Sequence, residues 1–438
     1  MALDHDELNR RRQEREKRRK KRQRAMYIRL VIAVIVLILC GVGIFILIRN
    51  TEPASSPVIA TTPVDAFEEE TEPPTEKRSS WDKEPVKIHI AAAGDLNITD
   101  KVIWSGQTSG DFNYTNAFMD VAPILSHADL SILNFEGNVC GAPYGTETLS
   151  APQQLLDALK NAGVDVLQMA NSCSIQNGLM GLTATLSNIR AAGLEPVGAY
   201  SSAEEFRKTK GYTICEVNGV KIALVAFTKG VGSLGLPVGS ENCVNLLYED
   251  YYTTYQTINK KSIREILRAA ESEKPDLTIA LLHWGSEYNE DISDSQKNIA
   301  NLLLAEGVDA IIGSHPHLVH QIDYNEEAGT IVAYSLGDFF GDGIRGGTNY
   351  SIILDLEITK DYDTNTTKIT DYTYIPIYTL AENQCDGFRR VIRLENAMTA
   401  YESNFVDKVT PECYENMVFA MDRIQKRINS GKEAEKSK

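Results

Sequence analysis

Residues 277–288 read LTIALLHWGSEY, and residues 308–317 read VDAIIGSHPH. In each stretch a short, almost wholly apolar run ends abruptly in a polar cluster that contains histidine. Runs this apolar predict β-strands covered on both faces, because a strand with one solvated face alternates apolar and polar residues. The two stretches therefore predict buried strands that carry reactive side chains at their carboxyl ends.

The same pattern recurs outward from these stretches. Four more apolar runs end in polar clusters: Val86–Ala93 before Gly94-Asp95, Leu130–Leu133 before Asn134-Phe135-Glu136, Val164–Ala170 before Asn171-Ser172-Cys173, and Ile331–Ala333 before Tyr334 to Asp338. Helices are expected between several runs, at about Pro152–Ala162, Leu179–Ala192, Lys260–Glu273 and Ser293–Glu306. This alternation predicts α/β layers. Because loops at strand carboxyl ends gather at one rim of such a sheet, the six clusters predict one site.

Histidine is concentrated in these clusters. The chain has seven histidines, and four of them are His283, His315, His317 and His320. Imidazole and carboxylate together suit borderline cations such as Mn, Fe or Zn. Residues i and i+2 of an extended segment point the same way, so His315 and His317 are expected to face one centre.

Two carboxylates complete the candidate metal site. Asp95 and Glu136 are placed to bridge or neutralise two cations, and two-metal centres of this kind activate water. Each residue has a plainer alternative: Asp95 as a turn cap, His283 as a hydrogen-bonded core histidine, and His320 as a structural side chain. The clusters taken jointly favour metal binding at His283, His315 and His317.

The net charge of −16 is unevenly distributed along the chain. Residues 1–49 hold 13 basic and 5 acidic side chains, a balance of +8, so the remainder carries −24. A domain this acidic is a poor partner for nucleic acid, which requires a basic footprint. An anionic polymer would need a local basic groove or a metal, for which the candidates are Lys229, Arg345, Arg389 and Arg390.

The N-terminal region predicts a membrane anchor. Residues 1–26 form a basic tail, and the 27–49 segment contains the uncharged run Leu30–Ile48, whose nineteen residues are long enough to span the hydrocarbon core. The positive-inside bias places the tail in the cytoplasm, where it would contact anionic lipid, and the rest outside. A cleaved signal peptide is the alternative. Residues 50–80 are Thr-, Pro- and Glu-rich and predict a disordered linker. An extracytoplasmic domain at 81–431 and a flexible tail at 432–438 complete the predicted organisation.

The clusters together resemble the poly-gamma-glutamate capsule synthesis protein family, the CapA family. The matching stretches are Gly94-Asp95, Asn134-Phe135-Glu136, His283 to Tyr288, Gly313 to His317, and Tyr334 to Asp338. The family is similar to calcineurin-like metallophosphoesterases, so the resemblance implies a four-layer α/β/β/α sandwich with a two-metal site. It also implies Asn171 and His283 as catalytic residues, and Glu287, Tyr288 and Asp338 as substrate contacts. Arg345 joins these contacts as the best placed of the basic candidates, in the Gly341–Gly347 loop just after the last polar cluster.

The chain departs from the family pattern beside the third strand. Asn171-Ser172-Cys173 followed by Gln176 stands where the family has Asn-Asn-His and then Asp. The departure suggests two hypotheses: metal binding is weakened, or a Cys140–Cys173 disulfide replaces the lost polar contact. No CxxC pair occurs, so a zinc ribbon is not expected.

The resemblance implies a membrane-anchored role in the synthesis, export or anchoring of an anionic envelope polymer such as poly-gamma-glutamate. Other capsule synthesis proteins are the expected partners. Three activities stay open at this point: a metal-dependent hydrolase or transferase on the polymer, a non-enzymatic assembly or polymer-binding module, and a phosphoesterase for small substrates.

Overall fold

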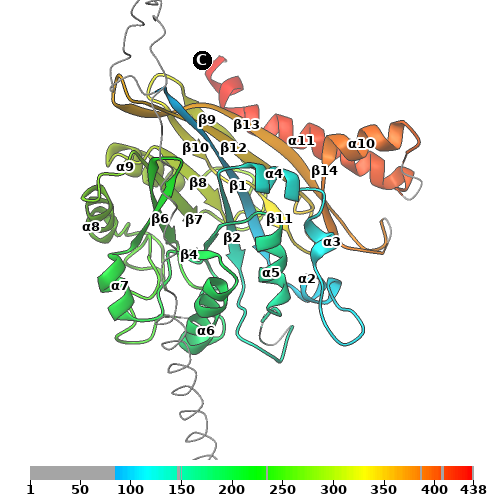
Figure 1. The fold of residues 1–438 in the computed structure, drawn as a ribbon, viewed down its shortest axis with the longest axis horizontal. Coiled ribbons are helices and arrows are strands. Elements are labelled where there is room, and N and C mark those ends of the chain that lie inside the picture. The colour runs from blue at the N-terminus through cyan, green and yellow to red at the C-terminus, as the bar shows by residue number, and fades with distance from the viewer. Residues whose placement is uncertain are drawn as a thin grey trace, which may run out of the picture. The chain divides into compact units, whose positions relative to one another are not determined.

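The computed structural model describes residues 84–436 apart from 146–147, 149, 233–234, 385–386 and 406–408, with side chains up to residue 430 (Figure 1). The predicted tail (1–26), anchor (27–49) and linker (50–80) lie outside the described residues. Within the described part of the chain, no helix is both long enough and apolar enough to cross a membrane. The described residues all belong to one compact unit, Lys77–Lys438.

Two mixed β-sheets form the centre of this unit. The strand order of the larger one is β14-β13-β12-β1-β2-β3-β4, with β11 paired to the end of β1. Its strands are β1 (Val86–Asn97), β2 (Leu130–Glu136), β3 (Val166–Gln168), β4 (Glu195–Val197), β11 (Asp338–Phe340), β12 (Tyr350–Asp361), β13 (Thr366–Leu380) and β14 (Arg390–Arg393). Strands β1 to β4 are parallel, and β12 pairs antiparallel with β1.

The smaller sheet has the order β5-β6-β7-β8-β10-β9. Its strands are β5 (Tyr212–Val217), β6 (Val220–Thr228), β7 (Leu277–His283), β8 (Ala310–Ser314), β9 (Ile322–Asn325) and β10 (Thr330–Ala333). The four strands from β6 to β10 in this order run parallel, and β5 and β9 close the two edges antiparallel. Each sheet therefore has its own set of parallel strands, whose carboxyl ends lead into loops at one edge of that sheet.

Helices cover the outer surfaces of the sheets (Figure 1). They are α2 (Asp100–Ser105), α3 (Thr115–Phe118), α4 (Ala122–His127), α5 (Gln154–Asn161), α6 (Gly178–Ala191), α7 (Ala203–Thr209), α8 (Lys260–Glu271), α9 (Asp294–Ala305), α10 (Leu394–Glu402) and α11 (Pro411–Lys436). Helix α9 begins at a capping box, in which Ser293 and Gln296 each accept from the other's backbone N–H. This exchange satisfies two N–H groups that a helix start otherwise leaves unpaired.

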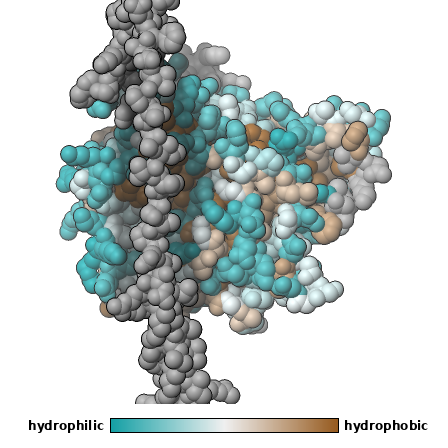
Figure 2. All heavy atoms as spheres, in the orientation of Figure 1, coloured by the Kyte–Doolittle hydropathy of each residue, from teal (hydrophilic) through white to brown (hydrophobic). Residues whose placement is uncertain are grey.

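The core has two parts. Side chains of both sheets, such as Ile90 of β1 and Leu281 of β7, belong to one buried cluster, so the sheets face each other. A second cluster joins the smaller sheet to its helices, with Val225 of β6 beside Ile263 of α8 and Ile299 of α9. Figure 2 shows hydrophilic residues over much of this face, with more hydrophobic areas between them.

The predicted α/β fold is confirmed, with all six predicted strands and all four predicted helices present. Helix α11 runs to Lys436, and the flexibility of the 432–438 tail stays a prediction. The expectation of a single sheet rim was also wrong. Because the parallel strands belong to two facing sheets, the polar clusters gather where two sets of strand ends meet.

A candidate two-metal centre

Six ionisable side chains converge at the junction of the two sheets. The larger sheet supplies Asp95 near the end of β1, Glu136 as the last residue of β2, and Asp338 as the first residue of β11. The smaller sheet supplies His283 as the last residue of β7, and the loop after β8 supplies His315 and His317. All six are at most 5% exposed. Charged groups this deeply buried require partners.

Two glycines bring β1 and β11 together. The backbone N–H of Asp95 donates to the carbonyl of Gly337 over 2.9 Å, and Asp95 lies in register with Asp338. A Cβ on Gly94 would lie 1.8 Å from Gly337 O, so no other residue fits at position 94 without moving the backbone. The close approach places two carboxylates on adjacent strands.

One set of ligand atoms consists of Glu136, His283 and His315, which offer atoms within 4.8 Å of one another. His283 Nε2 lies 3.0 Å from Glu136 Oε1, and the ring centroids of His283 and His315 are 4.4 Å apart. The other imidazole nitrogen of His283, Nδ1, lies 3.3 Å from Ser314 Oγ. That second contact fixes the orientation of the ring, as the outer partners of metal-binding histidines do.

A second set consists of Asp95, His317 and Asp338. His317 Nδ1 lies 2.7 Å from Asp338 Oδ1 and 3.6 Å from Asp95 Oδ2. The opposite nitrogen of the same ring, Nε2, is 3.7 Å from Glu136 Oε2, which links this set to the first. Glu287, His315 and His317 form a third, overlapping set at the cavity. Two adjacent cations are therefore compatible with the donor atoms present.

The His315-Pro316-His317 segment reaches the centre in a different way from the one predicted. His315 has φ of +92° and His317 has φ of +58°, so the segment is not extended and the i, i+2 argument was wrong. Non-glycine residues adopt positive φ at a cost in free energy. The backbone N–H of His315 donates to Asp95 Oδ2 over 3.1 Å, and this bond helps to hold the turn.

Two asparagines support the carboxylates. Asn134 Nδ2 donates to Asp95 Oδ1 over 2.5 Å. Asn171 Nδ2 contacts Asn134 Oδ1 and two backbone carbonyls, those of Phe135 and Gln168. The amide hydrogens of Asn171 thus hold protein atoms in place, and its catalytic role stays a prediction. The sequence analysis did not predict the supporting role of Asn134. The available signal was its place in the polar cluster that ends at Glu136.

The carboxylates have strongly displaced pKa values. Burial raises the pKa of Asp95, and the charge of Glu136 raises it further. Burial also raises the pKa of Asp338 to about 7, against the lowering effect of His317. Burial acts in the same sense on Glu136, but the charges of His283, His317 and His315 outweigh it and hold the pKa well below its usual range. Protons and cations therefore compete for the carboxylates of this centre.

The two histidines of the turn are displaced in opposite directions. Burial lowers the pKa of His315 well below its usual value, and the charge of His283 adds to the effect. Burial acts to lower the pKa of His317 as well, but the charge and hydrogen bond of Asp338 outweigh it and raise the pKa well above its usual value. A neutral His315 is the form in which imidazole ligates a metal.

The donor set fits divalent metal ions. His315 Nδ1 is buried without a hydrogen-bond partner, and His283 Nε2 faces the carboxylate of Glu136 over 3.0 Å. Buried polar atoms without a hydrogen bond are rare in folded proteins, and a bound cation is one explanation. The ligands are imidazole and carboxylate without thiolate, which suits Mn, Fe or Zn.

Three predicted substrate contacts lie at the outer wall of the centre. The Tyr288 ring stacks on His317 with centroids 5.4 Å apart, and Arg345 lies 5.4 Å above the Tyr288 ring. Glu287 is exposed beside them. Asp338 is buried and pairs with His317 in a ligand set, and its role as a substrate contact stays a prediction.

Residues 89–342 match the sequence profile of the family described as bacterial capsule synthesis protein PGA_cap. The chain belongs to this PGA_cap family. It is 27% identical over 269 residues to the capsule biosynthesis protein CapA of Bacillus anthracis, a match that covers 59% of this chain and 61% of that one. It is 29% identical over 250 residues to the PGA biosynthesis protein CapA of Bacillus subtilis (strain 168), which covers 56% and 61%. The chain thus spans about three fifths of these PGA_cap relatives.

Solved structures similar to this PGA_cap chain include phosphoesterases. A phosphatase from Mycoplasma pneumoniae is 17% identical with a TM-score of 0.43, and the match covers 67% of this chain and 95% of that one. The calcineurin-like phosphoesterase YfkN from Bacillus subtilis is 16% identical with a TM-score of 0.42, covering 78% and 99%.

The altered cluster of this PGA_cap chain changes one wall of the centre. Ser172 Oγ donates to Glu136 Oε1 over 2.9 Å, so the serine orients a ligand carboxylate. Burial raises the pKa of the Cys173 thiol, and the charge of Glu136 raises it further, so the sulfur stays protonated. Cys173 belongs to none of the ligand sets among the described residues. His320 bonds the Asn289 carbonyl, in keeping with its expected structural role.

The predicted Cys140–Cys173 disulfide is not formed, because both residues are free thiols. Cys140 Sγ instead lies 3.4 Å from Ser150 Oγ. Among the basic candidates for an anionic groove, Arg389 is taken up inside the fold: it pairs with Glu382 and donates to the carbonyls of Gly341 and Asp342. Arg390 lines a separate cavity of about 400 Å³, so Lys229 and Arg345 are the candidates beside the centre.

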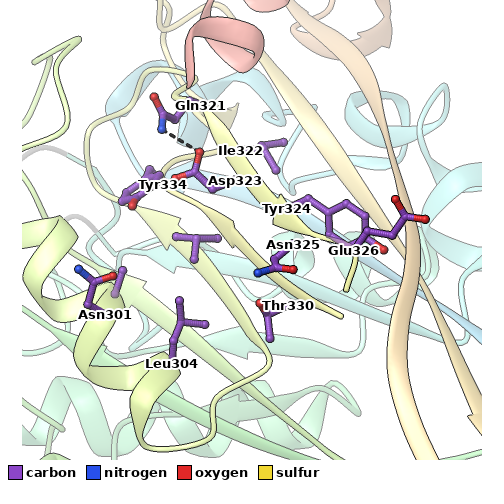
Figure 3. A pocket seen from close by; sticks show the side chains of 12 residues that line it. Asn301, Leu304, Gln321, Ile322, Asp323, Tyr324, Asn325, Glu326, Thr330 and Tyr334 are labelled. Carbon is purple, nitrogen blue, oxygen red and sulfur yellow. Dashed lines mark hydrogen bonds between the residues drawn. The ribbon is translucent and has the colours of Figure 1, made fainter. Parts of the chain in front are cut away.

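Two cavities differ in their relation to the metal centre. A cavity of about 330 Å³ is lined by Ser172, Lys229, Glu287 and His315 among others, and therefore opens onto the ligand sets. A larger one of about 560 Å³ lies between α9 and strands β9 and β10 (Figure 3). It contains no residue of the ligand sets and no basic side chain. The smaller cavity is therefore the better candidate for a substrate site, because it opens onto the metal-binding side chains.

Proposed function

We propose that this PGA_cap chain is a metal-dependent hydrolase or transferase that acts on an anionic envelope polymer such as poly-gamma-glutamate. The observation that carries the proposal is the group of overlapping ligand sets, buried together and opening through His315 and Glu287 onto a cavity. The names of the relatives support the polymer, since one is described as a PGA biosynthesis protein. The phosphoesterase-like sandwich expected from the sequence is part of this proposal.

Cations bound by these ligand sets would act as Lewis acids and lower the pKa of a water molecule. The protein's own groups would orient the reaction. His283 is held by Ser314, and Glu136 is held by Ser172, so both ligands are fixed before substrate arrives. The protonated His317–Asp338 pair can release its proton when a cation binds.

A second candidate function is a non-enzymatic assembly or polymer-binding module. It is supported by Ser172 and Cys173, because a protonated thiol replaces a histidine of the family pattern and provides no ligand. Under this proposal the domain binds polymer but does not cleave it.

We further propose that residues 27–49 anchor the protein in the cell membrane, with residues 1–26 in the cytoplasm and the domain outside. The uncharged run between Arg29 and Arg49 supports this placement. Contact with other capsule synthesis proteins is proposed because both relatives are named as capsule or PGA biosynthesis proteins. Protease digestion of intact cells tests the topology: loss of the domain from the outside is expected, and complete protection would contradict it.

The enzymatic proposal is tested with the full-length chain purified in detergent and supplied with Mn²⁺, Fe²⁺ or Zn²⁺. Time-dependent shortening of poly-gamma-glutamate that stops on chelation is expected. His315→Ala should abolish it, and His127→Ala, at an exposed histidine of α4, should not. Polymer binding without cleavage by the metal-loaded protein would favour the second function. Cleavage of a model phosphodiester alone would favour a phosphoesterase.

A further inference from the structure

Lys229 stands at the end of β6, directly beside the metal centre. Its backbone N–H donates to the carbonyl of His283 over 2.8 Å, which ties its position to a ligand residue. Its ammonium group donates to the carbonyl of Gly285 over 2.6 Å and lies 4.9 Å above the ring of Tyr255. The side chain is thus held at both ends inside the wall of the 330 Å³ cavity.

The charge of Lys229 is incompletely satisfied by the protein. An ammonium group has three N–H donors, and the structure shows one hydrogen bond for this one. Among the described residues, no carboxylate lies within ion-pair distance of Lys229 Nζ. Burial lowers the pKa of Lys229, and the more distant charge of Glu287 only partly opposes this effect. A half-buried cation of this kind gains free energy from an anionic partner.

The rest of the cavity lining favours an oxygen anion. Ser286 adds a hydroxyl donor to the lining, whereas the hydroxyl proton of Ser172 is already donated to Glu136. Among the described lining residues, Glu287 is the one carboxylate, and it belongs to a ligand set with His315 and His317. A cation held there would offset the repulsion between Glu287 and an incoming anion.

We propose that this cavity is a carboxylate subsite, in which Lys229 pairs with a free α-carboxylate of the polymer chain next to the bond at the metal centre. The inference rests on the proposed function and names the substrate group that the site selects. A γ-linked glutamate chain has one free α-carboxylate per residue, attached to the same carbon as the amide nitrogen. An anion at Lys229 therefore brings the neighbouring amide toward His315. This local cation lets a protein whose residues 50–438 carry a net charge of −24 bind a polyanion.

The test measures binding of a tri-γ-glutamate peptide to the full-length, metal-loaded chain by calorimetry. Lys229→Met removes the charge and keeps an unbranched side chain over Tyr255. It should weaken binding about tenfold or more, the usual effect of losing a charge-assisted bond. Lys229→Arg should retain most of the affinity. Lys101→Met, at an exposed lysine of α2, should bind as the wild type does. Metal content and thermal midpoint, unchanged in Lys229→Met, show that the variant is folded.

Two further ligands identify the anion. The same peptide with its α-carboxylates converted to carboxamides should bind the wild type and Lys229→Met equally weakly. Preference for an oligomeric glycerol phosphate over the peptide would overturn the carboxylate assignment. Equal binding of tri-γ-glutamate by the wild type and Lys229→Met would overturn the subsite while leaving the proposed function in place. No binding of the peptide by the metal-loaded wild type would overturn both.

Discussion

Gly94→Ala is expected to destabilise the protein and to disturb the metal centre together. An ideal Cβ at position 94 would lie 1.8 Å from Gly337 O, whereas an ordinary contact is at least 3.4 Å. Relief of this overlap requires the two strands to move apart by roughly 1.5 Å, which breaks the 2.9 Å bond from Asp95 N to Gly337 O. Overpacking costs about 1–3 kcal/mol and the lost hydrogen bond about 1 kcal/mol, so about 3 kcal/mol is expected.

Urea unfolding of the full-length chain, followed by tryptophan fluorescence, measures this loss. Gly346→Ala is the matched control, since a Cβ there meets nothing within 4 Å and the backbone has no positive φ. It should change the free energy of unfolding by less than about 1 kcal/mol, with a small gain favoured. Gly94→Ala should also hold less metal at equal protein concentration, because Asp95 moves with β1. Equal stability of the two variants would refute the close approach of β1 and β11.

Three other outcomes are expected. Burial raises the pKa of Asp309 to about 6, so the native state loses stability as the pH rises from about 4, the pKa of the unfolded chain, to about 6, and the loss is complete above that pH. Asp309→Asn should therefore stabilise the protein by about 1–2 kcal/mol at pH 8 and have little effect below about pH 3, where the aspartate is neutral in both states; an unchanged difference across pH would refute this. Cys173→Ala should leave metal content unchanged, because the protonated thiol belongs to none of the described ligand sets; loss of metal would show a thiolate ligand. Metal affinity should rise between pH 6 and 8 as Asp338, with a pKa of about 7, gives up its proton, and an affinity independent of pH in calorimetric titration would contradict this competition.

The sequence predicted the elements that are short, apolar and bounded by polar clusters. Strand β7, for example, is buried along its whole length, and the apolar run that ends at His283 indicated it. Strand β13 was missed, because its first half alternates exposed and half-buried residues and its second half is buried. Helix α11 was missed because its charged end was interpreted as a tail.

The convergence of the site residues was predicted, but its geometry was not. Asp95, Glu136, His283 and His315 do meet, yet strand ends of two sheets bring them together, and sequence does not show which sheet a strand joins. The positive φ of His315 depends on its bond to Asp95, a residue 220 positions away. Contacts of such long range follow from the tertiary fold and have no local sequence signal.

His315 and its neighbours are expected above all to bind divalent cations. Elemental analysis of the full-length chain, after equilibration with Mn²⁺, Fe²⁺ or Zn²⁺ and removal of free ions, measures this directly. Up to two ions per chain are expected, with at least one lost in His315→Ala and none lost in His127→Ala. A wild-type chain that retains no metal under these conditions, or a His315→Ala variant that retains as much as the wild type, would contradict the metal centre.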